Sequence, residues 1–131
     1  MSRQIDLIPW EQHCDWFENS LVNPSRYLYI IKIDSNPFGV ARFDLISSAN
    51  NSFEISINLA SYYRGKGLGS LLLNYVLIRF RKDLPGDKFI LAEIKRENTK
   101  SNLLFSKYGF NLTHQDITMN QYSFYLKKNN P

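Results

Sequence analysis

The sequence predicts an α/β domain in which helices alternate with the strands of one mixed sheet. Two observations predict this fold class. Residues 53–59 alternate apolar and polar side chains, as a strand with one buried face does, and an apolar segment of helical length follows at 68–80. A second pattern of a strand and then a helix follows at 88–95 and 99–108.

Length and composition limit the class of protein. A chain of 131 residues is enough for one core, and we expect residues 1–131 to form a single domain. No apolar run approaches the ~20 residues of a membrane span, and no signal-peptide pattern begins the chain. We therefore expect no membrane partner. Cys14 is the only cysteine, so no internal disulfide is possible, and we expect a cytoplasmic protein. The net charge of +4 suits anionic ligands but is too small to indicate nucleic acid.

The first predicted element is a helix that begins at Pro9, a residue favoured at the first helical position, and ends before Asn23-Pro24. Its apolar residues recur at helical spacing, and they are Trp10, Cys14, Phe17 and Leu21. His13 lies beside this stripe with no second histidine or acidic cluster nearby, so we expect no metal site.

Three strands are predicted next, joined by polar turns into an antiparallel meander. The segment Arg26–Ile33 is rich in aromatic and β-branched residues, and a turn at 34–37 leads to a returning strand at 38–46. A second polar turn leads to the strand at 53–60. After the interior strand Lys88–Lys95, a helix at Thr99–Tyr108 ends at Gly109, and strand candidates at 110–114 and 121–127 close the chain.

The turn between the alternating strand and its helix is a candidate anion site. It reads Arg64-Gly65-Lys66-Gly67-Leu68-Gly69, with three glycines and two cations. Such a turn exposes unpaired backbone N–H groups at the positive end of the helix dipole, which favours a phosphate or pyrophosphate. The two standard nucleotide fingerprints are both missing, since neither Gly-Lys-Ser/Thr nor Gly-x-Gly-x-x-Gly occurs here.

Two motifs give a resemblance to a known family. Arg64-x-x-Gly67-x-Gly69 resembles the acetyl-CoA signature of the GNAT acetyltransferase superfamily, and the segment from Asn98 to Gly109-Phe110 resembles the later motif of that superfamily. The resemblance covers about residues 9–128. It implies a mostly antiparallel sheet with a central parallel pair, 53–60 and 88–95, that splays around the pantetheine arm of acetyl-CoA. It also implies contacts to acetyl-CoA from Leu59, Ala60, Arg64, Gly65, Lys66, Gly67, Leu68, Gly69, Ser70, Asn98, Ser101 and Phe105.

Acetyl transfer to an amine needs a base, and two glutamates are candidates. Glu93 interrupts an apolar run, so we expect its carboxylate to be partly desolvated, with a raised pKa. In similar acetyltransferases a catalytic Glu stands five residues ahead of the motif asparagine, here Asn98. Glu54 is the rival, on a polar strand face that can also be merely solvated. A water relay is the third possibility.

An acid that protonates the leaving thiolate is less clearly indicated. Relatives often carry a Tyr four residues before the closing glycine, but that position is Phe105, which has no proton to give. Tyr108 could substitute, or it could be a core residue with a satisfied hydroxyl. The thiolate of CoA could also leave without an acid.

The acceptor amine is indicated by resemblance alone. Residues 9–21, the strand Arg26–Ile33 and the spacing from Asn98 to Ser101 resemble acetyltransferases of nucleotide-linked amino sugars, of the pseudaminic and legionaminic acid pathways. Relatives that acetylate protein N-termini or small amines are an alternative. A non-catalytic acyl-CoA sensor, half of a split enzyme, and a nucleic-acid-binding module are alternatives of other classes.

The start of the chain departs from the superfamily pattern. Eight residues precede Pro9, too few for the usual first strand and helix, so the sequence is either a shortened member or part of a longer chain. The strand Arg26–Ile33 would then have an open edge, which favours a homodimer. The alternative is a monomer in which residues 3–7 fold back as a substitute strand.

Overall fold

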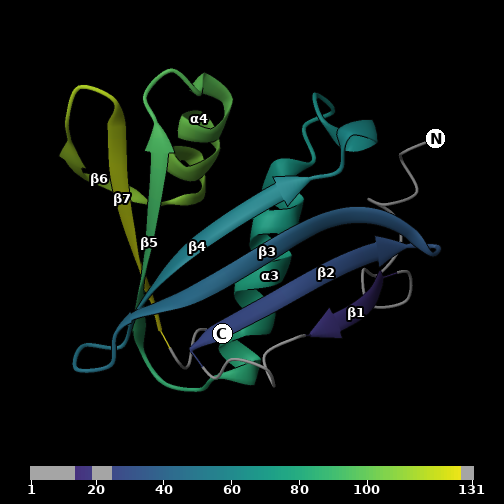
Figure 1. The fold of residues 1–131 in the computed structure, drawn as a ribbon, viewed down its shortest axis with the longest axis horizontal. Helices are drawn as coiled ribbons and strands as arrows, with labels where there is room; N and C mark the ends of the chain where they lie inside the picture. Colours follow the sequence, from purple (N-terminus) through teal and green to yellow (C-terminus); the bar gives the residue numbers. More distant parts are fainter. Residues whose placement is uncertain (1–13, 19–24, 128–131) are drawn as a thin grey trace.

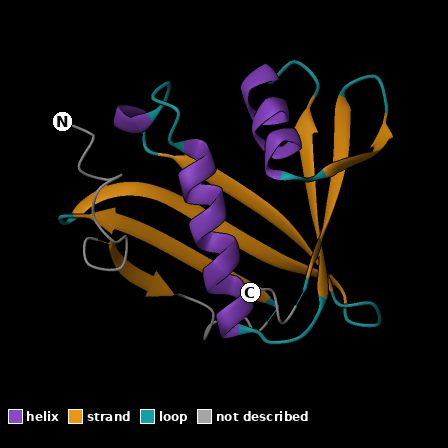
Figure 2. Ribbon diagram, turned by 180° about the vertical axis from the view of Figure 1, so that it is seen from behind, coloured by secondary structure: helices purple, strands orange, loops and turns teal. Residues whose placement is uncertain are grey.

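The computed structural model describes residues 14–18 and 25–127. Their strands form a seven-stranded sheet in the order β1-β2-β3-β4-β5-β7-β6. The strands are β1 Cys14–Glu18, β2 Arg26–Ile33, β3 Asn36–Ser47, β4 Ser52–Leu59, β5 Lys88–Lys95, β6 Asn111–Gln115 and β7 Met119–Leu126. The helices α3 (Gly69–Asp83) and α4 (Thr99–Tyr108) cover the same face of the sheet (Figures 1 and 2). No described helix is both long and apolar enough to cross a bilayer.

The predicted meander is confirmed, because β2, β3 and β4 pair antiparallel in sequence order. The turn between β2 and β3 is tighter than predicted. Asp34 and Ser35 both have positive φ, 52° and 71°, and β3 already begins at Asn36. Two central residues with positive φ are typical of the hairpin turns whose twist matches that of the strands.

The helix predicted from Pro9 is wrong over Cys14–Glu18, which forms β1. This strand pairs antiparallel with β2, from Cys14 opposite Ile33 to Glu18 opposite Tyr29. Aromatic residues suit strands, and the backbone groups at the edge of β2 offer partners that outweigh helical spacing. The rest of the predicted helix and the substitute strand at 3–7 lie outside the described residues.

The correction of β1 also removes the open edge. We expected β2 to lack a neighbour on one side, and this expectation is wrong because β1 covers that side. The homodimer therefore loses the physical argument on which it rested. The edges of the described sheet are β1 and β6.

The central strands β4 and β5 run parallel but pair over only a short stretch. Ser52, Phe53 and Glu54 lie opposite Phe89, Ile90 and Leu91, and the strands have no further paired residues. Beyond Glu54 the two strands diverge (Figure 1). The expected mixed sheet with a central parallel pair is thus confirmed, and the strands splay as the resemblance implied.

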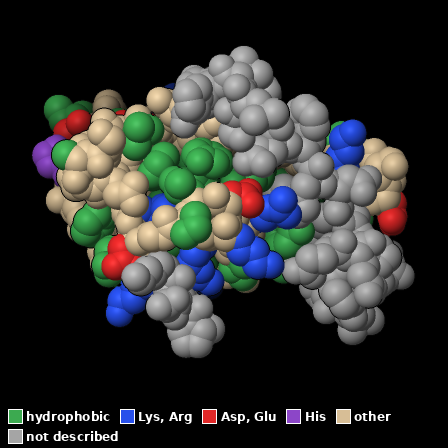
Figure 3. Space-filling model, turned by 90° about the horizontal axis from the view of Figure 1, so that it is seen from below, with side chains coloured by type: hydrophobic (Ala, Val, Ile, Leu, Met, Phe, Trp, Pro, Cys, Tyr) green, Lys and Arg blue, Asp and Glu red, His purple; other side chains and the backbone are tan. Residues whose placement is uncertain are grey.

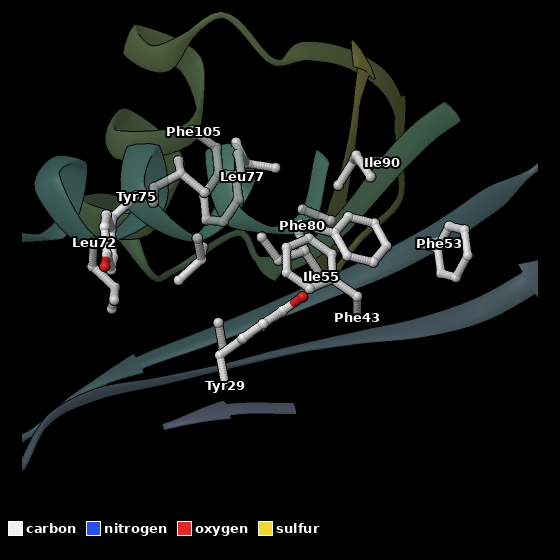
Figure 4. Packing of buried hydrophobic residues seen from close by; sticks show 14 of the residues in the cluster. Tyr29, Phe43, Phe53, Ile55, Leu72, Tyr75, Leu77, Phe80, Ile90 and Phe105 are labelled. Carbon is white, nitrogen blue, oxygen red and sulfur yellow. The ribbon is translucent and has the colours of Figure 1, made fainter. Parts of the chain in front are cut away.

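Helix α3 is fixed to the sheet by an aromatic cluster. The ring of Phe80 stacks on Phe43 with centroids 4.0 Å apart, and it meets the edge of Phe53 at 5.1 Å (Figure 4). The hydroxyl of Tyr29 donates to Asp83 Oδ2 at 2.8 Å. These contacts fix the C-terminal end of α3. The rest of the helix packs into the same core through its buried residues Leu72, Leu73, Tyr75, Val76 and Leu77.

A buried lysine stabilises the end of the sheet at which β4 and β5 are still paired. Lys88 is 1% exposed, and its Nζ donates to the carbonyl oxygens of Leu84 and Gly86 at 2.5 and 2.6 Å. These bonds satisfy carbonyl groups that follow α3, while burial lowers the pKa of Lys88. Asn51 Nδ2 donates to the carbonyl oxygen of Asp87 at 2.6 Å, which joins the start of β4 to that of β5.

Candidate active site

A cleft of about 1160 Å³ lies between the end of β4, the glycine-rich turn and α4. It brings together two segments of the chain that the sequence motifs singled out separately. The predicted cofactor residues that line it are Leu59, Arg64, Gly65, Gly67, Leu68, Gly69, Ser70, Asn98 and Ser101. Lys66, Ala60 and Phe105 are not among the lining residues.

The glycine-rich turn has the backbone that its sequence indicates. Gly65 and Gly67 have φ values of 76° and 73°, a conformation that side-chain-bearing residues rarely adopt. A Cβ atom at either position would meet no other atom within 4 Å, so packing does not require these glycines. At the start of α3, Leu68 provides no side-chain cap and the first turn has no acidic residue. Its free N–H groups can therefore bind an anion.

The two cations of the turn have different surroundings. The Arg64 guanidinium donates from Nε to the carbonyl oxygen of Leu59 at 2.9 Å and from Nη2 to Asn58 Oδ1 at 3.1 Å. Arg64 thereby ties the turn to the end of β4. Lys66 Nζ instead lies 5.2 Å from the centroid of the Tyr62 ring.

Asn98 caps the N-terminus of helix α4, and its Oδ1 accepts a hydrogen bond from the N–H of Ser101 at 3.2 Å. The side chain of Asn102 then fixes the helix to the sheet. Its Nδ2 donates to the carbonyl oxygens of Lys95 and Asn98, and its Oδ1 accepts from Asn120 Nδ2 at 2.8 Å and from the Tyr122 hydroxyl at 2.6 Å. Sequence reasoning missed Asn102, because no local pattern shows that its partners lie on β5 and β7.

The two candidate bases lie near the point where the strands separate. Glu54 is the last residue of β4 that pairs with β5, and its partner is Leu91. Glu93 lies two residues after Leu91 on β5, so its side chain is on the same face of the sheet as the side chain of Glu54. This face is opposite the buried one, and neither glutamate lines the cleft. Burial of Glu54, and then the negative charges of Glu93 and Asp44, raise the pKa of Glu54, while Arg42 opposes them.

The expected desolvation of Glu93 is wrong, because its side chain is exposed. Strand β5 buries alternate residues, Ile90, Ala92 and Ile94, so the position of Glu93 falls on the other face. The apolar residues before Glu93 therefore lie on both faces of the strand, and they do not bury the Glu93 side chain. Glu54, which is partly buried, has the property that was expected of Glu93.

The candidate acid Tyr108 lines the cleft, and its hydroxyl donates to Asn74 Oδ1 on α3 at 3.0 Å. Burial raises the pKa of Tyr108. Phe105 is 3% exposed and packs in the core, with its ring centroid 4.9 Å from that of Phe110.

Sequence reasoning also missed part of the cleft wall on α4. Lys100, Leu103 and Lys107 line the cleft together with Leu104. The spacing of i, i+3 and i+7 places the first three on one side of a helix, and this signal was available in the sequence.

Charges of both signs occur together on one face of the molecule. In the view from below, Lys and Arg side chains lie beside Asp and Glu side chains, with hydrophobic side chains between them (Figure 3).

Within the described part of the chain, no group of three or more His, Cys, Asp or Glu side chains could hold a metal ion.

Comparisons with known proteins agree with this geometry. The sequence model of the acetyltransferase (GNAT) family matches residues 3–110. The solved structure of N-acetyltransferase PseH from Campylobacter jejuni is similar, with 19% identity and a TM-score of 0.64 over 83% of this chain and 72% of that one. A comparison with curated proteins found no match.

Two further similar structures contain coenzyme A. Spermidine N-acetyltransferase from Vibrio cholerae, in complex with CoA and spermine, is 19% identical, with a TM-score of 0.68 over 83% of this chain and 70% of that one. RimL, a ribosomal L7/L12 α-N-protein acetyltransferase in complex with coenzyme A, is 17% identical, with a TM-score of 0.69 over 84% and 67%. At these identities the likeness shows a shared fold.

Proposed function

The chain belongs to the acetyltransferase (GNAT) family, and we propose that it transfers the acetyl group of acetyl-CoA to a primary amine. One observation carries this proposal. The splay of β4 and β5 opens beside a glycine-rich turn whose free N–H groups suit a pyrophosphate. Acetyl-CoA has this combination of an extended arm and a pyrophosphate.

The residues present fit acetyl-CoA. The first turn of α3 would hold the pyrophosphate, and Arg64 would keep the turn in place through its bonds to Leu59 and Asn58. Asn98 and Ser101 would face the pantetheine arm from α4. When bound, acetyl-CoA supplies the activated acetyl group, and the protein must supply orientation and proton transfer.

We assign Glu54 as the base that accepts a proton from the acceptor ammonium. Its raised pKa brings the carboxylate closer to the working range of a general base, and the charge of Glu93 contributes to that shift. Glu93 is the second candidate, and a water relay from either glutamate the third. Tyr108 would be the acid for the leaving thiolate, since it lines the cleft and its hydroxyl is held by Asn74.

The acceptor that we test first is the amino group of a nucleotide-linked amino sugar, on the resemblance of residues 9–21, Arg26–Ile33 and Asn98–Ser101. Small polyamines are a second candidate. Glu54 and Glu93 make no ion pair with any described residue, and two neighbouring carboxylates favour a cationic acceptor. A protein N-terminus is a third class, and a non-catalytic acyl-CoA sensor a fourth.

One experiment separates these functions. Thermal unfolding with acetyl-CoA, followed by release of free CoA in the presence of each amine class, measures binding and turnover separately. We expect a raised Tm with acetyl-CoA and CoA release with one amine class. A raised Tm without CoA release for any amine would support the sensor, and an unchanged Tm would contradict the proposal.

Three further expectations stay proposals: a cytoplasmic location, a single domain over residues 1–131, and a homodimer. Spermidine N-acetyltransferase from Vibrio cholerae is described as a dodecamer. A dimer of this chain would not use the edge of β2, which β1 covers. Light scattering checks this, because a stable monomer near 15.4 kDa would contradict the dimer.

A further inference from the structure

We propose that Asp44 is a positioning residue for the base Glu54, because it holds the Arg42 guanidinium and keeps it from pairing with the Glu54 carboxylate. The inference rests on the proposed function, in which Glu54 accepts a proton from the acceptor ammonium. It adds to the site the strand β3, none of whose residues lines the cleft.

Asp44 and Glu54 lie directly opposite each other on the antiparallel strands β3 and β4. Directly opposite residues point to the same face of a sheet, and the residues beside them, Phe43 and Phe53, are buried on the other face. Like charges in this arrangement destabilise each other unless a cation compensates them. The structure places arginines, and not a cation between the strands, beside one of the two carboxylates only.

Arg42 could pair with either carboxylate. It stands two residues before Asp44 on the same face of β3, and its direct partner on β4 is Ser56, so Glu54 is its diagonal neighbour. Diagonal neighbours across a sheet are within reach of long side chains. Yet Arg42 Nε donates to Asp44 Oδ2 at 2.8 Å, and Glu54 makes no ion pair with any described residue. Asp44 therefore determines where the Arg42 charge lies.

Asp44 is held from two sides. Arg26 lies opposite Asp44 on β2 and donates from Nε to Asp44 Oδ1 at 2.6 Å, so each oxygen of the carboxylate has its own guanidinium. The side chain of Asp44 is 28% exposed, whereas those of Arg26 and Arg42 are 47% and 44% exposed. The carboxylate is thus the less mobile centre of this network, and the guanidinium groups are directed by it.

The charged groups that face Glu54 come from both neighbouring strands, Arg42 and Asp44 from β3 and Glu93 from β5. Burial, then Glu93 and then Asp44 raise the pKa of Glu54, and Arg42 lowers it. A guanidinium bonded directly to Glu54 would stabilise the carboxylate and make it a weaker base. By holding Arg42, Asp44 limits the opposing effect of that cation.

Titration of the Glu54 carboxyl carbon by NMR tests this inference on the full chain, with Glu54→Gln used to assign the signal. Asp44→Asn keeps the shape of the side chain but releases Arg42, so it should lower the midpoint of the Glu54 titration. The acid limb of kcat/KM should move to lower pH, and its plateau should fall about three- to tenfold because the base is weaker. Glu97→Gln, at an exposed residue of the loop after β5, controls for the loss of one negative charge and should keep the wild-type midpoint.

A double-mutant cycle separates the positioning of Arg42 from the direct effect of the Asp44 charge. In an Arg42→Gln background, Asp44→Asn should lower the midpoint much less than it does in the wild type, because no guanidinium is released. An equal decrease in both backgrounds would overturn the inference. So would an Asp44→Asn variant with the wild-type midpoint.

Two further substitutions protect the test from an unstable variant. Asp44→Ser also removes the carboxylate and has the same expected results, whereas Asp44→Glu keeps a carboxylate within reach of Arg42 and should keep the wild-type midpoint. A midpoint that Asp44→Glu lowers as much as Asp44→Asn does would overturn the inference. The NMR titration needs no turnover. A folded wild type that releases no CoA with any amine would therefore contradict the proposed function, while the midpoints still decide whether Asp44 holds Arg42 away from Glu54.

Discussion

The side chain of Leu104 on α4 lies against Gly69, the first residue of α3. A Cβ atom on residue 69 would stand 3.1 Å from Leu104 Cδ2, closer than ordinary van der Waals contact. Gly69 therefore lets two helices from opposite walls of the cleft meet. The other two glycines of the turn differ, because the space around a Cβ there is open and their positive φ is the requirement.

This difference predicts that one substitution mainly lowers stability and that another mainly lowers acetyl-CoA binding. Gly69→Val should overpack the contact with Leu104 and lower the free energy of unfolding by about 1–3 kcal/mol. Gly67→Asp should cost less stability, because Asp tolerates positive φ better than most residues do. It should nevertheless abolish acetyl-CoA binding, since its negative charge lies where the pyrophosphate is proposed to bind.

Chemical denaturation and calorimetry measure the two effects. Gly86→Ala is the control, because Gly86 also has positive φ but lies in the turn between α3 and β5, away from the cleft. If Gly67→Asp binds acetyl-CoA as the wild type does, the pyrophosphate binds elsewhere.

Glu54→Gln should lower turnover by about 10²–10⁴-fold, because it keeps the shape of the side chain and removes the base. In the wild type, kcat/KM should rise with pH through the raised pKa of Glu54, and this limb should disappear in the variant. Affinity for acetyl-CoA should change little. The pH–rate profiles of both proteins, with Glu93→Gln as the matched comparison, check this assignment.

The opposite pattern would reassign the base. If Glu93→Gln loses turnover and Glu54→Gln does not, Glu93 accepts the proton. If both variants keep the activity and the pH limb of the wild type, neither glutamate is the base, and solvent removes the proton.

The raised pKa of Glu54 also predicts that the residue lowers the stability of the protein at neutral pH, where it is proposed to act as the base. The folded protein holds a proton on Glu54 more tightly than the unfolded chain does. The corresponding stability is present below the ordinary pKa of 4.5 and is lost as pH rises through the folded value. At pH 7 Glu54→Gln should therefore raise Tm, and below pH 4.5 this gain should vanish.

Thermal unfolding of the wild type and of Glu54→Gln across pH tests this sign. Glu97→Gln, at an exposed residue of the loop between β5 and α4, controls for the loss of one negative charge. An equal gain in Tm for both variants would attribute the effect to net charge. A lower Tm for Glu54→Gln at pH 7 would contradict the prediction.

Local patterns predicted the strands and helices best where one face is buried. The bounds of β2, β5 and α4 match the prediction residue for residue, since periodicity and the cap residues Asn98 and Gly109 are local signals. β1 could not be predicted in this way. Its apolar residues fit helical spacing as well, and its state depends on the free edge of β2, which is distant in sequence.

The candidate site shows the same limit. The glycine-rich turn could be predicted from the sequence, because the glycines that adopt its positive φ values lie close together in the chain. The splay depends on the register between β4 and β5, which only their packing sets. The difference between the partly buried Glu54 and the exposed Glu93 was likewise not predictable, because both lie on the same face and only Glu54 belongs to the stretch in which β4 and β5 pair.

The last prediction concerns the role of Tyr108, whose hydroxyl is held by Asn74 on the neighbouring helix. If Tyr108 protonates the leaving thiolate, Tyr108→Phe should lower turnover with acetyl-CoA by about 10²-fold or more. The loss should be much smaller with an acetyl thioester of an acidic thiol, because such a thiolate leaves without a proton. A merely structural role would lower turnover with both donors alike. Tyr62→Phe, at an exposed tyrosine outside the cleft lining, is the matched control and should leave both rates unchanged.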